Sequence, residues 1–208
     1  MSAATPAGGA GRRAAAGSGG EEGAQRTRDV CSAEHAGWLT MPGRRLLTNP
    51  SRILHGLVRP GDTVVDLGCG PGFFTLPMAE MVGDGGGVIA VDLQAAMLDK
   101  LRSRAERKGL AGRIRLHQCS SDALGLDGER ADFALAFWMV HEVPDSARFL
   151  EEVHAVLREG AQLLLVEPRG HVSAEAFADT EAAAMRLHMQ PTARPKVAFS
   201  RTMLLRRA

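Results

Sequence analysis

Residues 64–75 hold the residue types and spacing best suited to chemistry in this chain of 208 residues. An apolar, β-like stretch contains Asp66 near its end, glycines follow at Gly68, Gly70 and Gly72, and a helical pattern comes next. Glycine is needed where the backbone turns sharply or where a ligand must approach it closely. The pattern is typical of a strand, a tight turn and a helix N-terminus that lie against a cofactor.

The spacing of these glycines separates two classes of cofactor. A dinucleotide fingerprint has the form Gly-x-Gly-x-x-Gly, in which the third glycine allows close helix packing beside a pyrophosphate. In this chain Phe73 stands at that third position and the last glycine comes one residue earlier, at Gly72. Asp66 would repel a pyrophosphate, whereas an acid at this place suits an ammonium group. The loop therefore favours S-adenosylmethionine over NAD.

Strand-like and helical segments alternate along the rest of the chain. We expect strands at residues 63–67, 88–91, 114–117, 133–137 and 162–166. We expect helices at about 72–82, at 95–108, from Asp145 or Ser146 to a stop at Gly160, and at 173–187, with short helices between 42 and 57. An antiparallel pair is expected near 187–190 and 197–205. Such alternation implies right-handed crossovers and a mostly parallel α/β sheet, with the ligand beyond the carboxyl ends of its strands.

The segment from Asp66 through Gly72, Asp-Leu-Gly-Cys-Gly-Pro-Gly, resembles the first motif of the class I S-adenosylmethionine-dependent methyltransferases. The similarity continues in the expected order from about residue 43 to the C-terminus. Residues 140–145 and 166–168 resemble the small-molecule branch that is similar to quinone-biosynthesis enzymes, the methyltransferase type 11 group. The resemblance implies a Rossmann-like, doubly wound, mostly parallel sheet of seven strands with an antiparallel C-terminal edge hairpin.

The resemblance also implies the reaction, an in-line transfer of the activated methyl group to an O, N, S or C nucleophile with release of S-adenosylhomocysteine. It places the methionine end of the cofactor over the loop that contains Asp66, Gly68, Cys69, Gly70 and Gly72. We expect Cys69 to be a small packing residue beneath the cofactor, the alternative being a reactive thiol.

Two further strand ends supply the residues expected to hold the nucleoside. Asp92 can accept hydrogen bonds from both ribose hydroxyls, while the alternative, a helix-capping aspartate, is compatible with that role. We expect Leu93 and Met97 to line the adenosine side. By resemblance, Asp122 accepts the adenine amino group and the backbone amide of Ala123 reaches the ring, although a loop aspartate is a common alternative.

The fourth strand end carries the residues expected to do the chemistry. Phe137 and Trp138 could form a wall that excludes water from the pocket. His141 and Glu142 are the candidates for a general base or a substrate anchor, because imidazole titrates near neutral pH. The alternative for His141 is a histidine that bonds to backbone and holds the loop. No Asp/Asn-Pro-Pro-Tyr/Phe tetrapeptide follows this strand, which disfavours amino methylation of adenine or glutamine.

The overall composition excludes several classes of protein. The formal net charge is +1, so nothing in the balance indicates a nucleic-acid partner. The longest apolar runs fall far short of the roughly 18 residues that indicate a membrane span. Three cysteines, widely spaced, form neither a disulfide framework nor a zinc pattern, so we expect a cytoplasmic protein with no metal site.

The sequence divides into three parts. Residues 1–28 are rich in Ala and Gly and are expected to be a disordered tail rather than a targeting leader. Residues 29–60 are expected to form a helical cap, in which Cys31 and His35 lie at helical spacing, either on a lid over the pocket or on a surface helix. Residues 61–208 are expected to form the methyltransferase domain.

The function expected is transfer of a methyl group to a small-molecule acceptor. The acceptor pocket would come from the N-terminal helices, from residues 168–184 or from a second subunit, so a homodimer remains open. Two alternatives are a methyltransferase that acts on RNA or protein, and a non-catalytic partner protein that binds S-adenosylmethionine. Analogy at the level of the fold does not fix a substrate.

Overall fold

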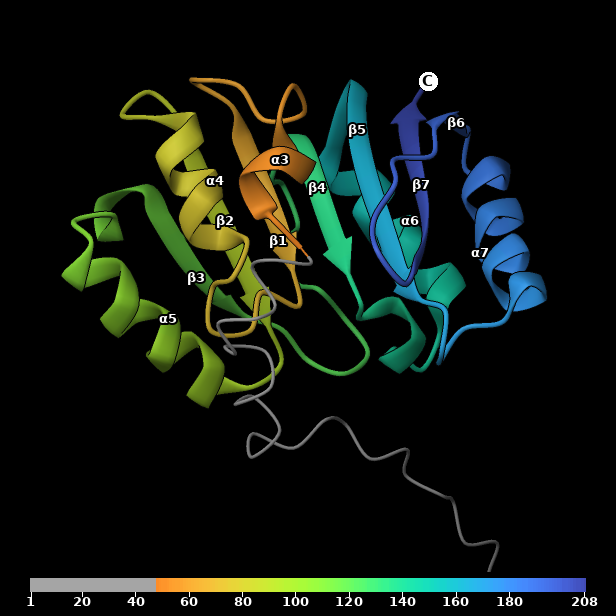
Figure 1. Cartoon of the computed structure of the whole chain (residues 1–208), viewed down its shortest axis with the longest axis horizontal. Coiled ribbons are helices and arrows are strands. Elements are labelled where there is room, and N and C mark those ends of the chain that lie inside the picture. The colour runs from red at the N-terminus through yellow and green to blue at the C-terminus, as the bar shows by residue number, and fades with distance from the viewer. Residues whose placement is uncertain (1–47) are drawn as a thin grey trace, which may run out of the picture.

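The protein folds around one seven-stranded sheet, seen in the computed structural model, which describes residues 48–208. The strands lie in the order β3-β2-β1-β4-β5-β7-β6 (Figure 1). Their bounds are β1 Thr63–Leu67, β2 Gly87–Asp92, β3 Ile114–Gln118, β4 Ala131–Phe137, β5 Leu157–Pro168, β6 Met189–Ala193 and β7 Ser200–Arg207. The helices are α3 Pro50–Leu54, α4 Thr75–Val82, α5 Ala95–Arg107, α6 Ser146–Val156 and α7 Ala174–Arg186, with 3₁₀ turns η2 Ala111–Arg113 and η3 Val140–Glu142.

The strand order reverses at the middle of the sheet. β1 pairs in parallel with β2 on one side and with β4 on the other, so that Val64 lies beside both Val88 and Phe133. β7 runs antiparallel to β5 and β6, with Leu164 opposite Leu204. The expected fold class is confirmed: an α/β, doubly wound, mostly parallel sheet with an antiparallel C-terminal edge. In such sheets ligands bind beyond the carboxyl ends of the strands where the order reverses, here β1 and β4.

Both faces of the sheet are covered by helices, which is why its central strands are apolar almost throughout. Val64 packs with buried residues of α3, α4 and α5, whereas its neighbour Val65 packs with buried residues of α6 and α7. Figure 1 shows α3 and α4 in front of the sheet and α6 behind it. The two hydrophobic clusters thus fix the strands, and with them the positions at which the strands end.

The expected stop of the sixth helix at Gly160 is wrong. α6 begins at Ser146, capped by the side chain of Asp145, and ends at Val156. β5 then begins directly at Leu157, which is fully buried and pairs with Ala131. Gly160 lies inside β5 with φ of +75°, near an irregularity in the pairing with β4. Burial of Leu157 in the core therefore ended the helix before the glycine was reached.

Other boundaries moved because single residues adopt left-handed backbone conformations. Gly72 has φ of +87°, so α4 begins at Thr75 rather than at residue 72. His188 and Phe199 have φ of +59° and +55°, and β6 and β7 begin directly after them rather than at residues 187 and 197.

The domain division of the sequence stays a prediction. Residues 1–47, which include the expected tail, Cys31, His35 and most of the helical cap, lie outside the described residues. α3 is the described part of the expected helices between 42 and 57 and is capped by the Asn49 side chain. Within residues 48–208, no helix combines the length and the apolar character that crossing a bilayer requires.

Candidate functional site

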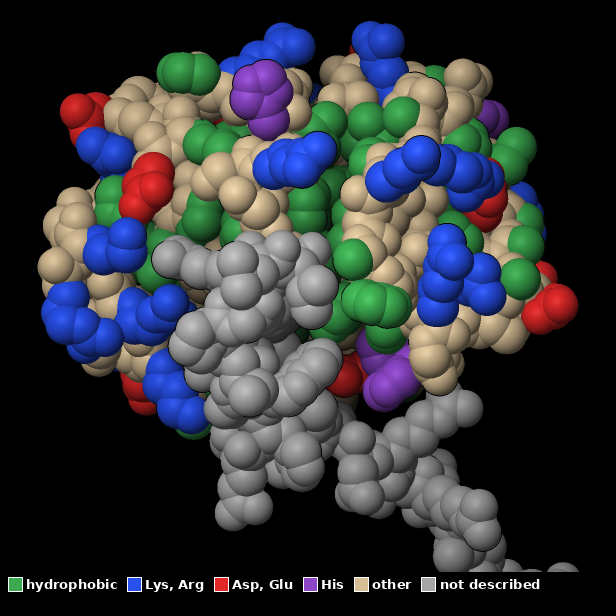
Figure 2. Space-filling model, in the orientation of Figure 1, with side chains coloured by type: hydrophobic (Ala, Val, Ile, Leu, Met, Phe, Trp, Pro, Cys, Tyr) green, Lys and Arg blue, Asp and Glu red, His purple; other side chains and the backbone are tan. Residues whose placement is uncertain are grey.

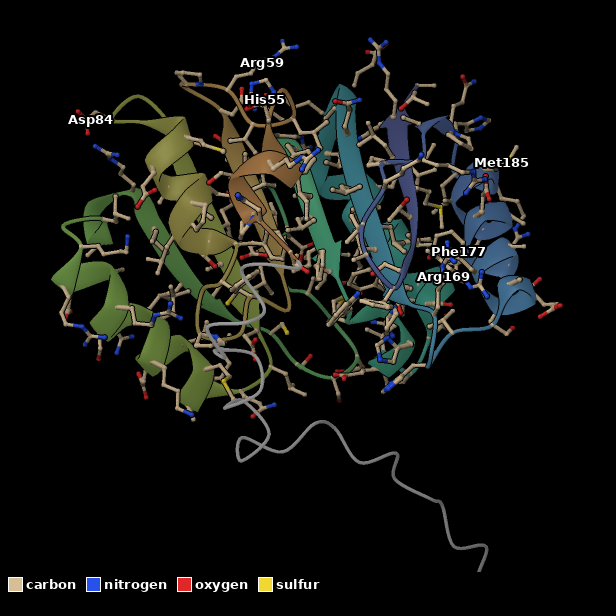
Figure 3. All side chains as sticks on the ribbon, in the orientation of Figure 1. His55, Arg59, Asp84, Arg169, Phe177 and Met185 are labelled. Carbon is tan, nitrogen blue, oxygen red and sulfur yellow. The ribbon has the colours of Figure 1, made fainter. Side chains whose placement is uncertain are left out.

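The carboxyl ends of β1, β2, β4 and β5 bring most of the expected site residues to one edge of the sheet. This is the lower edge in Figure 1, and Figure 2 shows histidine and acidic side chains along it. In Figure 3, Arg169 lies toward this end of β5, whereas His55, Arg59 and Asp84 lie at the opposite edge. The candidate site therefore lies at the lower edge.

The loop after β1 is packed tightly at both ends and open in its middle. Gly68, Gly70 and Gly72 all have positive φ, of +67°, +51° and +87°. A Cβ on Gly68 would lie 3.0 Å from side-chain carbons of Met139, and a Cβ on Gly72 would overlap Leu101. A Cβ on Gly70 would have no described atom within 4 Å. The backbone at Gly70 is thus accessible to a ligand within the described part of the chain.

Asp92 ties this loop to the end of β2. Its Oδ2 accepts the backbone N–H of Gly70 at 2.8 Å, and its Oδ1 accepts that of Gln94 at 2.9 Å. Its side chain is largely buried, and burial raises its pKa. Gln94, not Asp92, is the N-cap residue of α5, so Asp92 binds the residue before the helix and is not the helix cap given as the alternative to ribose binding. Since a carboxylate has about four acceptor positions, two remain after these bonds.

Asp66 lies beneath the loop at the end of β1. It is 2% exposed, and its Oδ2 accepts the hydroxyl of Thr75 at 2.5 Å. Burial raises the pKa of Asp66 to about 7, with a smaller contribution from the charge of Asp92 and an opposing one from the Thr75 bond. Within residues 48–208, neither Asp66 nor Asp92 forms an ion pair with a basic side chain. A cation at this end of the sheet would therefore meet two carboxyl groups that no described basic side chain neutralises.

The other residues expected to contact adenosine are less clearly gathered. Met97 is buried on α5, and Leu93 is half-buried with its carbonyl accepting the side chain of Gln118 at 3.2 Å. Asp122 is exposed and accepts the hydroxyl of Ser120 at 2.8 Å, which is the largest cause of its lowered pKa. Ala123 closes the same turn through its carbonyl, which accepts the backbone N–H of Ser120. This geometry suits the loop alternative, and the contacts with adenine stay a prediction.

Aromatic rings form a continuous row from the start of α4 to the end of β4. Ring centroids of Phe74 and Phe137 are 4.5 Å apart, and those of Phe137 and Trp138 are 5.2 Å apart. Trp138 has φ of +59°, a conformation that costs a non-glycine residue about 1–2 kcal/mol. Its indole N–H donates to Oγ of Ser200 at 3.0 Å, and its backbone N–H donates to the carbonyl oxygen of Val166 at 2.7 Å. Strain of this kind clusters at functional sites.

His141 and Glu142 lie together on η3, as the sequence indicates, but the main partner of the histidine is a third residue. Nδ1 of His141 is 2.5 Å from Oε2 of Glu167, at the end of β5. The other carboxylate oxygen of Glu167 accepts the backbone N–H of Val140 at 2.9 Å. The hydrogen bond to Glu167 is the largest cause of the raised pKa of His141, and burial raises the pKa of Glu142.

The sequence reasoning missed Glu167 and His171 as site residues. The ring of His171 packs edge-on against that of His141, with centroids 5.5 Å apart. Glu167 is only 3% exposed. The sequence does contain a pattern that could have identified Glu167: an acidic residue at the end of an apolar strand, as at Asp66 and Asp92. The alternative role for His141 was a histidine that bonds to backbone and holds the loop. In the structure the His141 ring bonds to the Glu167 side chain instead, and it is Glu167 that accepts the backbone N–H of Val140.

The thiols near the site suit a packing role. Cys69 is buried, and burial raises its pKa, as it does for the half-buried Cys119. Cys69 and Cys119 flank β2, where their backbone N–H groups donate to the carbonyls of Val91 and Asp92. A thiol with a raised pKa is a poor nucleophile.

Comparisons with known proteins agree with this geometry. Residues 64–160 match the family model described as a methyltransferase domain. The ubiquinone/menaquinone biosynthesis C-methyltransferase UbiE of Xanthomonas oryzae is 33% identical over 120 residues, which cover 58% of this chain and 47% of that protein. The chain thus spans about half the length of the curated relatives that it matches.

Solved structures support the same assignment at the level of the fold. A SAM-dependent methyltransferase from Aquifex aeolicus superimposes with a TM-score of 0.76 at 22% identity, covering 84% of this chain and 98% of that one. A SAM-dependent O-methyltransferase from Thermotoga maritima superimposes with a TM-score of 0.62 at 19% identity, and the match covers 77% of this chain and 64% of that one. The glycine loop and the sheet order agree with the matched model: residues 64–160 match a methyltransferase domain, and the fold is the one seen in S-adenosylmethionine-dependent methyltransferases.

Proposed function

We propose that the protein transfers a methyl group from S-adenosylmethionine to a small organic acceptor at the lower edge of the sheet. The observation that carries the proposal is the link between Gly70 and Asp92, which sets an open stretch of backbone beside two acidic side chains. The relatives named for C-methylation in ubiquinone and menaquinone biosynthesis support a small organic acceptor.

The residues at this edge fit the chemical groups of S-adenosylmethionine. Its positive charge suits Asp66 and Asp92, which no basic side chain neutralises within residues 48–208. Its ribose hydroxyls suit the two unused acceptor positions of Asp92. A pyrophosphate fits poorly, because it would add negative charge beside these two carboxyl groups.

When bound, S-adenosylmethionine would supply a methyl group carried on a positively charged sulfur. The acceptor gains the methyl group and loses one proton, and the sulfur leaves as a neutral thioether. The protein contributes alignment and a dry site. Phe137 and Trp138 supply apolar surface at the end of β4, and His141 is the proposed acceptor of the proton.

The overall charge supports a small acceptor rather than a nucleic acid. The net charge of the whole chain is +1. Nucleic-acid binding proteins instead gather basic residues over the binding surface.

Isothermal titration calorimetry tests the cofactor assignment directly. The purified chain should bind S-adenosylmethionine and S-adenosylhomocysteine but not NAD. A screen with methyl-labelled S-adenosylmethionine against phenols, enols, amines, thiols and RNA then tests the acceptor. Binding of NAD without S-adenosylmethionine would overturn the proposal, and transfer to RNA with a steep salt dependence would replace the small acceptor.

A further inference from the structure

Glu167 is the least expected polar residue of the site, because it ends a strand whose core is apolar. β5 is an interior strand between β4 and β7, and its residues Leu163, Leu164, Leu165 and Val166 are fully buried. A buried carboxylate needs partners for its oxygens, since losing water otherwise costs several kcal/mol. Each Glu167 oxygen has one: the backbone N–H of Val140 at 2.9 Å and Nδ1 of His141 at 2.5 Å.

This pairing determines which nitrogen of His141 carries the proton. A carboxylate can only accept hydrogen bonds, so a ring nitrogen 2.5 Å from it must be the donor. The proton of the neutral imidazole is then on Nδ1, and Nε2 holds the free lone pair. Nε2 lies 3.9 Å from Oε1 of Glu142, beyond hydrogen-bond distance.

The same contact fixes the ring in space. Because Glu167 also holds the backbone of Val140, one side chain anchors both the η3 turn and the imidazole that it carries. The His141 side chain is 20% exposed, so the ring is not sealed in the core. A group that is fixed, hydrogen-bonded on one nitrogen and accessible is arranged for proton transfer.

We propose that Glu167 is a positioning residue that holds His141 with Nδ1 protonated, which makes Nε2 the proton acceptor of the site. This inference rests on the proposed methyl transfer and narrows its substrate to acceptors whose nucleophilic atom carries a removable proton, such as a phenol, an enol or an acidic carbon. The acceptor X–H bond breaks and its electron pair stays on X, while the proton forms an N–H bond to Nε2. The resulting imidazolium lies against the Glu167 carboxylate and later returns its proton to water.

Within residues 48–208, three titratable groups face the ring of His141 and define its pH response. Glu167 contacts it from β5, Glu142 lies beside it on η3, and His171 packs against it from the turn after β5. Glu167 and Glu142 both favour the protonated ring, and Glu167 does so most strongly. A pH titration of His141 therefore reports mainly on Glu167.

Glu167→Gln is the sharpest variant, because the amide can keep the backbone contact while reversing the hydrogen bond to the ring. Its carbonyl oxygen can accept from Val140, and its NH₂ group would donate to Nδ1 of His141. The neutral ring would then carry its proton on Nε2 and could no longer accept one there. Glu159→Gln is the matched control, since Glu159 lies exposed near the start of the same strand.

The experiment is ¹⁵N NMR of the histidine-labelled full chain without ligand, with His141 assigned by the signal lost in His141→Gln. In the wild type and in Glu159→Gln we expect the neutral His141 ring to carry its one proton on Nδ1, and the pKa of the ring to lie above its ordinary value of 6.5. In Glu167→Gln we expect protonation on Nε2 and titration at lower pH. A ring protonated on Nε2 in the wild type, or one unchanged by Glu167→Gln, would overturn the inference.

Kinetics separate this inference from the proposed function. With a phenol or enol identified by the methyl-transfer screen, Glu167→Gln should lower kcat at least tenfold and change KM little; the upper limit is the roughly 10²–10⁴-fold that positioned proton transfer contributes. Transfer only to acceptors that carry no removable proton would overturn the inference but keep the methyltransferase. Absence of S-adenosylmethionine binding would overturn the proposed function, while the NMR result would still decide the pairing.

Discussion

The backbone N–H of Gly70 donates to the carboxylate of Asp92 at 2.8 Å, so the loop after β1 and the acid at the end of β2 form one unit. Residues 22 positions apart in the chain thus share one hydrogen bond at the edge of the sheet. A change in either residue alters both the shape of the loop and the charge beside it.

Replacing Asp92 by Ala should weaken binding of S-adenosylmethionine at least tenfold, which corresponds to about 1.4 kcal/mol. The variant loses the charge and the acceptor positions, and it also frees the Gly70 N–H. Calorimetry measures the change, with Asp84→Ala as the control, since Asp84 lies exposed at the opposite edge (Figure 3). Unchanged affinity in Asp92→Ala would remove this residue from the binding site.

Replacing Gly70 by Ala should impair binding beyond its effect on stability. Gly70 and Gly109 both have positive φ and no described atom within 4 Å of an added Cβ. Alanine should therefore destabilise either position by about 1–2 kcal/mol through backbone strain alone. Only Gly70→Ala should also weaken S-adenosylmethionine binding, measured by calorimetry alongside thermal unfolding. Equal affinities in the two variants would show that no ligand approaches Gly70.

Asp66→Asn should make the protein more stable at pH 8 and its cofactor affinity less dependent on pH. Burial raises the folded-state pKa of Asp66 to about 7 from its ordinary value of 3.8, so this group lowers the free energy of unfolding as the pH rises from about 4 to 7. Asp66→Asn should therefore increase the free energy of unfolding by up to about 4 kcal/mol at pH 8 and leave it unchanged at pH 3. Denaturant unfolding at the two pH values measures this.

The same residue predicts how cofactor binding depends on pH. A cationic ligand favours the ionised carboxyl group, so wild-type affinity should fall as the pH drops below about 7. This dependence should be weaker in Asp66→Asn and kept in Asp99→Asn, whose side chain is exposed on α5. A pH dependence that is the same in all three proteins would contradict a cation beside Asp66.

His141→Gln should reduce turnover far more than cofactor affinity. Loss of a positioned base lowers kcat by about 10²–10⁴-fold, whereas the contacts of Gly70 and Asp92 are left in place. The wild-type rate should increase with pH through a value above 6.5, because Glu167 stabilises the protonated ring and the neutral ring is the active form. His55→Gln, exposed at the opposite edge, is the control. A wild-type rate in His141→Gln would exclude this residue as the base.

Local patterns in the sequence determined the elements and most strand ends. The run from Thr63 to Leu67 was predicted with its observed bounds, because apolar residues between two turns admit little else. The glycines at 68, 70 and 72 indicated the sharp turn that their positive φ values confirm. The placement of Asp66, Asp92 and His141 at the ends of strands also followed from such patterns.

The tertiary structure decided which strand ends meet, because neighbours in a sheet follow from the pairing of distant segments. Glu167 lies 26 residues from His141, and only the parallel pairing of β4 with β5 brings their side chains together. The same pairing buries Leu157 and extends β5 through Gly160, against the local helix-stop signal. Sequence periodicity tells which residues face the core, whereas contacts across the sheet depend on strand order, which no local pattern encodes.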